Sequence, residues 1–506
     1  MKHTLILVLS WIVIPHTSCD GIDSLTFPDG FLFGVATSSY QTEGAWNESD
    51  KGVSIFDSWV QSCPECIADR SHGNIASDSY HKYEEDAMLI KQLGFNYYRF
   101  SISWSRILPN GLTNNVNKEG IRHYKDIIEV LLRNSIEPVV TIYHYDHPQV
   151  LEEMGGWTNE LMVEWYLDYA KIVFREFGPM VKIFTTINEP QEMCAGYNDN
   201  GTAPGKLLPN MVGYYLCLHN VLKAHAKAYH MYDDEFRASQ NGLISINNPC
   251  SGQVLDDSRD TISADTSFQF YCGMVGHPIY IGDYPPIVKE RVALVSKYLG
   301  YHKSRLPTFS PKWISYIKGT ADFFGLNSYT SEIAHPDPDE ARGIYNSDSG
   351  IITTHKPTWH NSSIFWLKSV PEGFGNLLRK IKVDYNNPLV FVTENGFPDY
   401  GELNDIDRIN YFRSYLEELI IAVKRDGCRI SRYTIWSLLD NWEFHFGYTT
   451  PFGIIKVDFN SPSRERIPKS SAYWWKEVIR THRLQDVPNI NVILANIESV
   501  LKSHHR

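Results

Sequence analysis

Two glutamates stand in short frames where apolar runs end. Glu189 lies in Thr186–Pro190 (TINEP) and Glu394 in Val392–Gly396 (VTENG), 394 − 189 = 205 residues apart. A carboxylate at the end of a buried strand is costly unless another group pairs with it or uses it. One such Glu alone is most simply an ion-pair partner or a cap. Two of them suit cleavage of a glycosidic bond, in which one carboxyl protonates the leaving oxygen and the other attacks the sugar.

Short apolar segments that alternate with longer amphipathic ones must position these glutamates. The predicted strands are Phe31–Ala36, Tyr97–Ile102, Pro138–Tyr143, Ile183–Asn188, Leu243–Ile246, Phe323–Asn327, Leu389–Glu394 and Arg432–Ser437. The predicted helices include Tyr80–Leu93, Ile121–Asn134, Leu161–Phe177, Val212–Tyr232 and Asp407–Arg425. The alternation indicates a parallel sheet, and eight units indicate closure. We therefore expect an α/β fold, a single (β/α)8 TIM barrel with extended βα loops. An open doubly wound sheet would need a Gly-rich phosphate turn after its first strand, and none follows here.

Polar side chains follow almost every predicted strand. They are Gln41, Glu43, Arg99, His144, Asn188, Glu189, Asn327, Tyr329, Glu394, Trp436 and Glu443. In a barrel of this type the active site lies where the strands end. We expect these residues to converge on one pocket, whereas ordinary loop residues would have no reason to do so.

The composition limits the classes of partner. Hydrophobic residues make up 43% of the chain and aromatic residues 13%, which is ample for a large core. The net charge of −12 argues against nucleic acids and anionic membranes, because both reward basic patches. No His/Cys/Asp cluster has metal-ligand spacing, so we expect neither a metal nor an organic cofactor. The sequence leaves the oligomeric state open, with a homodimer among the options.

The first 19 residues have the pattern of a secretory signal peptide. Lys2 precedes an apolar run over Leu5–Ile14, and small residues suit cleavage before Asp20. The alternative is a buried N-terminal helix. We expect a secreted protein whose barrel domain spans residues 20–506, and no later segment is apolar for long enough to span a membrane. Three glycosylation sequons are consistent with secretion and begin at Asn47, Asn200 and Asn361.

Eight cysteines are present, and Cys19 falls within the predicted signal peptide. Cys63–Cys66 (CPEC) could form a tight disulfide loop in an oxidising compartment. A redox dithiol would need a thioredoxin-like context, and zinc would need a second ligand pair. We favour a structural disulfide and leave the other five cysteines unassigned.

An ordered series of motifs makes the chain closely resemble glycoside hydrolase family 1, the β-glucosidases and their relatives. Besides the two Glu frames, the motifs are Phe27–Phe31, Ala36–Gly44, Tyr98–Arg106, Gly325–Tyr329, Trp436–Asn441 and Ser471–Trp475. The resemblance covers nearly the whole mature chain. Trp157–Asn159 and Asp233–Arg237 resemble secreted animal members, in particular insect ones.

The resemblance implies a retaining mechanism. Glu394 is then the nucleophile, and Glu189 is the general acid and later the general base. Arg99 and Tyr329 resemble the residues that support the nucleophile. Asn188 corresponds to the residue that hydrogen-bonds the sugar 2-hydroxyl.

The resemblance also implies roles for five residues around the sugar. Gln41, His144 and Glu443 match positions that hold the other glycone hydroxyls. Trp436 matches the platform under the sugar, and Trp366 resembles the aromatic wall of the aglycone subsite. A carboxylate at Glu443 would repel a 6-phosphate, so we expect no phosphoglycosidase activity.

Three positions depart from the family pattern. Tyr145 follows His144 where Trp is usual, His147 stands where an apolar residue is common, and Phe444 follows Glu443 where Trp is again usual. These departures leave galactosides and fucosides open beside glucosides. The Pro/Asp-rich stretch from His335 to Ser363 is predicted to form a long loop near the aglycone.

The motifs together predict a retaining β-glycosidase that hydrolyses β-D-glucosides through a covalent glycosyl-enzyme. One alternative is a thioglucosidase acting on glucosinolates. Plant enzymes of that kind typically lack the acid/base Glu, although animal ones can retain it. The other alternative is a non-catalytic, receptor-like barrel, which would usually have lost one of the two carboxylates.

Overall fold

The computed structural model describes residues 25–199, 201–206, 208–256 and 258–488. The predicted signal peptide at residues 1–19 and the sequon at Asn200 lie outside the described residues.

Eight parallel strands form a closed barrel, as the sequence predicts. They are β1 (Leu32–Ala36), β2 (Tyr97–Ser101), β3 (Glu137–Tyr143), β4 (Ile183–Asn188), β5 (Leu243–Pro249), β7 (Phe324–Asn327), β12 (Val390–Asn395) and β13 (Ile430–Trp436). Their order around the barrel is β1-β13-β12-β7-β5-β4-β3-β2. Each strand thus neighbours the barrel strands before and after it in the chain, and β13 closes against β1. The (β/α)8 prediction is confirmed, and every predicted strand overlaps one of these eight.

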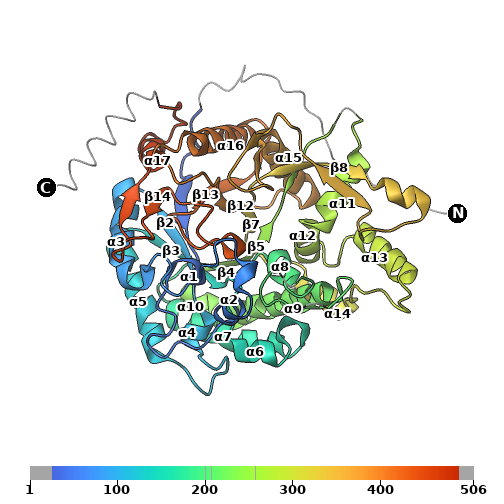
Figure 1. Ribbon diagram of the computed structural model, residues 1–506, viewed down its shortest axis with the longest axis horizontal. Coiled ribbons are helices and arrows are strands. Elements are labelled where there is room, and N and C mark those ends of the chain that lie inside the picture. The colour runs from blue at the N-terminus through green and yellow to red at the C-terminus, as the bar shows by residue number, and fades with distance from the viewer. Residues whose placement is uncertain (1–24, 200, 207, 257, 489–506) are drawn as a thin grey trace.

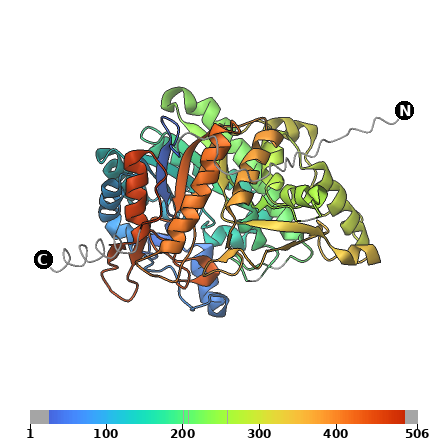
Figure 2. The same ribbon diagram turned by 90° about the horizontal axis from the view of Figure 1, so that it is seen from above.

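Helices surround the barrel, as Figures 1 and 2 show. The larger ones are α2 (Ile55–Ser62), α3 (Ser79–Leu93), α5 (Lys118–Arg133), α7 (Met162–Phe177), α9 (Val212–Glu235), α11 (Thr261–Phe270), α12 (Gly273–Tyr280), α13 (Pro286–Tyr298), α15 (Pro371–Asp384), α16 (Ile406–Lys424) and α17 (Ser470–Thr481). Shorter helices are α1 (Ser39–Thr42), α4 (Trp104–Ile107), α6 (Gln149–Glu153), α8 (Pro190–Ala195), α10 (Arg237–Gln240) and α14 (Pro311–Ile317). In the part of the chain that the structure describes, no helix is both long and apolar enough to cross a membrane.

Helix α5 illustrates how the sequence builds this outer layer. The side chain of Asn117 accepts hydrogen bonds from the backbone N–H groups of Glu119 and Gly120, and so caps the helix. Apolar residues then recur at helical spacing, and Ile121, Tyr124 and Ile128 are all buried. Burying such a stripe against the sheet stabilises the helix more than its intrinsic propensity does.

The interior of the barrel is built in layers, because side chains of a strand alternate between its two faces. A separate apolar cluster lies near the strand starts and contains Tyr97, Val139, Ile183, Phe323 and Phe391. Two residues further along β2, β3 and β4 the interior becomes polar. The Nε of Arg99 donates to Oγ1 of Thr141 at 3.0 Å, and Thr141 and Thr185 are joined at 2.9 Å. The apolar layer closes the floor, and the polar layer carries the site.

The two strands that deliver the glutamates are irregular at their ends. The pairing of β12 with β7 shifts register between Val392 and Glu394, and the pairing of β4 with β5 shifts between Thr185 and Asn188. Glu189 itself has φ 37°, in the left-handed region. Register shifts of this kind re-aim side chains next to active sites. They turn both carboxyls toward the mouth of the barrel.

The stretch from His335 to Ser363 contains more structure than the predicted loop. Strand β9 (Ile351–Thr354) pairs antiparallel with β8 (Ser331–Pro336), and β6 (Gly252–Gln253) adds a third strand. Two small hairpins complete the described strands, namely β10 (His360–Asn361) with β11 (Lys368–Ser369), and β14 (Ile455–Val457) with β15 (Arg466–Pro468). Ile351 and Thr353 of β9 line the cavity at the mouth of the barrel, so part of this stretch reaches the cavity, and its place near an aglycone stays a prediction.

Three disulfides cross-link the described chain. Cys63 and Cys66 are bonded, which confirms the predicted pair. Cys194 is bonded to Cys217, and Cys250 to Cys272. Of the five cysteines that the sequence left open, Cys428 remains a buried thiol.

Candidate active site

A cavity of about 650 Å³ opens at the carboxyl ends of the barrel strands. This volume is in the range of small-molecule sites. The predicted residues that line it are Gln41, His144, Glu189, Tyr329, Trp366, Glu394, Trp436 and Glu443. Asn188 and Arg99 are buried in contact with this group. All ten site residues predicted from the sequence therefore come together.

Glu394 is held by two donors. Nη1 of Arg99 lies 2.5 Å from Oε1 of Glu394, and the hydroxyl of Tyr329 donates to Oε2 at 2.5 Å. Arg99 also donates to the backbone carbonyl of Thr393 and to Oδ1 of Asn188. Because Arg99 is fixed on several sides, its positive charge faces the carboxyl permanently. These two bonds fix the orientation of the Glu394 carboxyl at the cavity.

The surroundings of Glu189 differ from those of Glu394, because they favour the protonated form of its carboxyl. Burial raises the pKa of Glu189 to about 8, and the nearby carboxylates of Glu394 and Glu192 act in the same direction. Hydrogen bonds from Tyr145 and Asn327 oppose part of that rise. The carboxyl consequently carries a proton at neutral pH, as a general acid must.

The amide of Asn188 has a fixed orientation between the two glutamates. Its Oδ1 accepts from Nη2 of Arg99 at 2.8 Å, from Asn247 at 3.2 Å and from Asn327 at 3.1 Å. Three donors on the oxygen leave the NH2 group facing the cavity side, where it donates to the hydroxyl of Tyr145 at 3.1 Å. The NH2 group also lies 3.3 Å from Nε2 of His144 and 3.4 Å from Oε2 of Glu189, so it is held among side chains that line the cavity.

A second polar cluster lies on the opposite wall around Glu443. Gln41 donates to Oε2 of Glu443 at 3.2 Å, and Nε1 of Trp436 donates to Oε1 at 3.0 Å. Burial raises the pKa of Glu443 to about 8, which the hydrogen bond from Trp436 partly offsets. The ring of His144 stacks on Trp436 with centroids 5.9 Å apart. This wall combines a flat aromatic face with hydrogen-bonding groups, the pairing that a sugar ring needs.

Glu43 was expected at the pocket, and this expectation is wrong. Its carboxyl forms an ion pair with Nη2 of Arg106 at 3.2 Å and accepts from the hydroxyl of Tyr124 at 2.7 Å. Because Glu43 faces α5 instead of the barrel mouth, these bonds satisfy it away from the cavity. Its role is to tie the first βα loop to the outer layer.

Several residues that line the cavity were not predicted from the sequence. Glu192 lies three residues after Glu189, in α8, and its Oε1 accepts from the hydroxyl of Tyr271 at 2.6 Å. The i, i+3 spacing could have placed Glu192 beside the site. Phe56 and Trp59, by contrast, come from the first βα loop and carry no signal of their own.

Two of the three positions that depart from the family pattern, Tyr145 and Phe444, touch each other. The rings of Tyr145 and Phe444 lie 5.6 Å apart, and Phe444 packs on Phe56 at 5.4 Å. On the outer side of the cavity, Trp366 meets Tyr329 edge-on at 6.3 Å. Within the described residues, no group of His, Cys, Asp and Glu side chains has the arrangement of a metal site.

The comparisons with known proteins agree with this geometry. The sequence profile of glycosyl hydrolase family 1 matches residues 23–484. The chain belongs to this family. A family 1 relative, myrosinase 1 of the aphid Brevicoryne brassicae, is 42% identical over 90% of this chain and 98% of its own. Human cytosolic β-glucosidase is 39% identical over 91% of this chain and 99% of its own.

Solved structures of family 1 members superpose closely. The aphid myrosinase structure has a TM-score of 0.86 at 42% identity, covering 90% of this chain and 99% of that one. A mutant rice β-glucosidase in a covalent complex with glucose has a TM-score of 0.83 at 35% identity, with coverage of 90% and 99%. This family 1 chain is accordingly a glycoside hydrolase of the retaining β-glucosidase type. A receptor-like barrel without activity does not fit a site in which both carboxyls are kept and held.

Proposed function

We propose that this enzyme cleaves β-D-glucosides that carry an uncharged, apolar aglycone, with Glu394 as nucleophile and Glu189 as acid/base. The observation that carries the assignment is the contrast between the two carboxyls. Glu394 faces the guanidinium of Arg99, whereas burial keeps Glu189 protonated in the same cavity. A carboxyl that faces a fixed cation suits a nucleophile, and a carboxyl that keeps its proton suits a general acid.

The mechanism then has two steps. Glu394 attacks the anomeric carbon while Glu189 transfers its proton to the aglycone oxygen, which leaves as an alcohol. Glu189, now ionised, takes a proton from water, and that water releases the sugar from Glu394. The hydroxyl of Tyr329 and Nη1 of Arg99 hold the carboxylate of Glu394 before attack and after release.

The glycone is assigned to the wall around Glu443. Gln41, His144 and Glu443 supply hydrogen bonds to the sugar hydroxyls, and Trp436 lies under its apolar face. Asn188 donates to the 2-hydroxyl next to the anomeric carbon. Trp366 belongs to the aglycone part of the cavity, where it offers an aromatic face.

The aglycone part of the cavity is lined mainly by apolar side chains, and its charged groups are carboxyls. Among the described lining residues, the acidic ones outside the assigned sugar wall and catalytic pair are Glu192 and Glu332, and none is Lys or Arg. The sulfate of a glucosinolate would therefore find no cationic partner in the lining, although oxyanions are usually bound by such groups. The pocket favours neutral O-glycosides.

A thioglucosidase is the second candidate. The 42% identity to aphid myrosinase over most of both chains favours it. An activated thiol-derived leaving group needs less protonation than an alcohol, so this candidate would not use the held proton of Glu189. We therefore rank it below the O-glucosidase.

We also propose that the protein is secreted and N-glycosylated. Three disulfides in the described chain are typical of proteins that fold in oxidising compartments. The sequon residues Asn47 and Asn361 are both exposed. The apolar run near the N-terminus supplies the signal. Endoglycosidase treatment of the protein collected from the culture medium, followed by mass measurement, tests this proposal.

A panel of nitrophenyl β-glycosides and one glucosinolate tests the catalytic assignment. We expect the β-glucoside to be hydrolysed and the glucosinolate to be cleaved far more slowly. The galactoside and the fucoside show how far Tyr145 and Phe444 relax the sugar specificity. Faster cleavage of the glucosinolate than of every O-glycoside would overturn the assignment.

A further inference from the structure

A tyrosine hydroxyl contacts the acid/base carboxyl. Oη of Tyr145 donates to Oε2 of Glu189 at 2.7 Å and accepts from Nδ2 of Asn188 at 3.1 Å. The Tyr145 side chain is almost completely buried, and it lines the cavity. A Trp or Phe ring at this position carries no hydroxyl for such a bond.

The hydroxyl of Tyr145 retains the proton that it donates to Glu189. Burial raises the pKa of Tyr145 well above its ordinary value, and the carboxylates of Glu189 and Glu192 raise it further. The phenol thus keeps its proton at any working pH. A donor that is always protonated stabilises the ionised carboxyl more than the neutral one.

We propose that Tyr145 is a positioning residue for the acid/base, whose hydroxyl orients the carboxyl of Glu189 and stabilises its ionised form. The proposal rests on the assignment of Glu189 as acid/base. Stabilising the ionised form makes proton release to the aglycone oxygen easier. It also favours the state that accepts a proton from water in the second step.

The other groups that face Glu189 act mostly in the opposite direction. Glu394 on β12 and Glu192 on α8 are both carboxyls, and each favours the protonated form of Glu189. The remaining donors are the amides of Asn188 on β4, at 3.4 Å, and of Asn327 on β7. His144 is stacked on Trp436 and is held neutral, because burial lowers its pKa. Tyr145 is therefore the hydroxyl that counters the two acidic neighbours.

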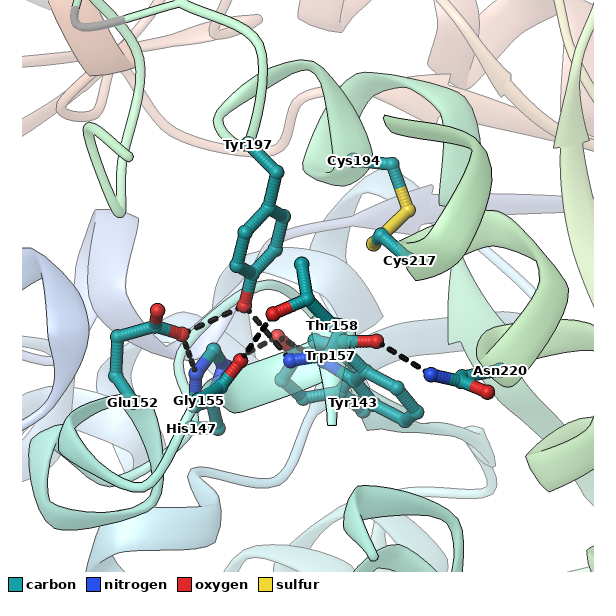
Figure 3. Close-up of a disulfide and its surroundings, with 10 residues drawn as sticks. All are labelled: Tyr143, His147, Glu152, Gly155, Trp157, Thr158, Cys194, Tyr197, Cys217 and Asn220. Carbon is teal, nitrogen blue, oxygen red and sulfur yellow. Dashed lines mark hydrogen bonds and ion pairs between the residues drawn. A yellow bond between two sulfur atoms is a disulfide. The ribbon is translucent and has the colours of Figure 1, made fainter. Parts of the chain in front are cut away.

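Hydrogen bonds on both sides of Tyr145 fix the segment that carries it, and Figure 3 shows those that join Tyr143, His147, Glu152 and Tyr197. His147 lies between the hydroxyl of Tyr143, 2.7 Å from Nδ1, and the carboxyl of Glu152, 3.0 Å from Nε2. The hydroxyl of Tyr197 and Nζ of Lys206 also reach Glu152, at 2.6 Å and 2.7 Å. These bonds hold both ends of the turn on either side of Tyr145.

The carboxyl that Tyr145 contacts is anchored as well. Glu189 is the N-cap residue of α8, and Cys194 near the end of α8 is bonded to Cys217 of α9. Tyr197, just after α8, is the same residue that reaches Glu152. Donor and acceptor are thus tied to one framework. The φ of Tyr145 is 71°, a conformation that this framework must maintain.

The test compares Tyr145→Phe with wild type in the pH dependence of kcat/KM for a nitrophenyl β-glucoside. Protonated Glu189 is the active form in the first step, so its pKa sets the alkaline limb. Without the hydroxyl, we expect that limb to move to higher pH by about one unit. Replacing Tyr145 by a fluorotyrosine, a stronger donor, should move the limb to lower pH.

The matched control is Tyr229→Phe. The hydroxyl of Tyr229 also donates to a carboxylate, Oδ1 of Asp322 at 2.9 Å, away from the cavity. We expect this variant to keep the wild-type pH profile. An unmoved limb in Tyr145→Phe, or an equal shift in Tyr229→Phe, would overturn the proposal.

A direct titration separates this proposal from the proposed function. Carbon-13 NMR of glutamate-labelled enzyme follows the carboxyl of Glu189, with Glu189→Gln assigning its signal. The midpoint of that titration should rise in Tyr145→Phe whether or not a given glycoside is hydrolysed. An unchanged midpoint contradicts the role of Tyr145, whereas an inactive wild type contradicts only the catalytic assignment.

Discussion

Arg99 and Glu394 form an ion pair with 2.5 Å between Nη1 and Oε1, and both side chains are almost completely buried. The two residues come from β2 and β12, which do not neighbour each other in the barrel. The pair thus spans the interior and fixes the carboxyl over the polar layer. Removing one partner of such a buried pair leaves the other charge uncompensated.

Glu394→Gln should abolish turnover. The amide keeps the volume and the contact with Tyr329, but it cannot attack the anomeric carbon. We expect kcat on a nitrophenyl β-glucoside to fall by roughly 10⁴-fold or more, with little change in far-UV circular dichroism. Glu85→Gln, on the exposed side of α3, serves as the matched control and should remain fully active. Near-normal activity of Glu394→Gln would refute its role as nucleophile.

Glu189→Gln should separate the two chemical steps. General acid–base assistance contributes roughly 10²–10⁴-fold, and a poor leaving group depends on it most. A dinitrophenyl glucoside should therefore still be attacked by Glu394, which gives a burst of phenol followed by a stalled glycosyl-enzyme. Azide should restart turnover and yield the β-glycosyl azide.

Two outcomes of the azide experiment would contradict the mechanism. An α-azide product would indicate inversion and exclude the two-step pathway. The absence of both burst and rescue would mean that Glu189 is not the acid/base.

Raising the pH should destabilise the fold through Glu189. Its pKa is about 8 in the folded protein and about 4.3 in an unfolded chain. The folded state therefore binds the proton more tightly, and its stability falls as pH rises from roughly 4 to 8. Glu189→Gln removes this loss. From pH 5 to pH 8 we expect the free energy of unfolding of the variant to rise relative to that of wild type by on the order of 1 kcal/mol or more. Urea unfolding of both proteins at both pH values measures this difference. An equal pH dependence in both proteins would contradict this prediction.

Charge on the aglycone should matter at Glu192. For an aryl glucoside bearing a carboxylate and its methyl ester, wild type should favour the ester in kcat/KM. Burial raises the pKa of Glu192, so the measurement is made at a pH high enough to ionise it. Glu192→Gln should then reduce that preference by about 5- to 10-fold, because one repulsive charge is lost. The preference is the kcat/KM for the ester divided by the kcat/KM for the carboxylate. Comparing this preference between variant and wild type cancels the difference in leaving group between the two substrates. Glu290→Gln, an exposed residue on α13, should leave the preference unchanged.

The sequence predicted the barrel, and with the family resemblance it named ten residues that the structure brings together at one cavity. Strand ends could be read because apolar runs stop at polar residues, as at Asn188 and Glu394. The contact between Tyr145 and Glu189 could not be predicted, since it depends on register shifts and a left-handed residue after β3. Glu43 was predicted at the cavity by the same rule and is not there. A polar residue after a strand can also be one that pairs with the outer layer, as Glu43 does with Arg106.

Long-range pairing was also beyond the sequence. The partners of Cys194 and Cys250 depend on which helices pack together, and several pairings were compatible with the spacing. Tyr271 follows α11 directly, and its hydroxyl donates to Glu192. Nothing in the local sequence predicts that contact. The predicted signal peptide lies outside the described residues and stays a prediction.

The apolar layer of Tyr97, Val139, Ile183, Phe323 and Phe391 fills the barrel interior beneath the polar layer. Substrate must enter glycone first, and the aglycone, nearer the mouth, must depart before the sugar can follow. An alcohol that enters while the glycosyl-enzyme waits takes the same route as water. The closed floor therefore leaves a single route, through the mouth of the barrel, for the substrate, the departing aglycone and the water that completes hydrolysis.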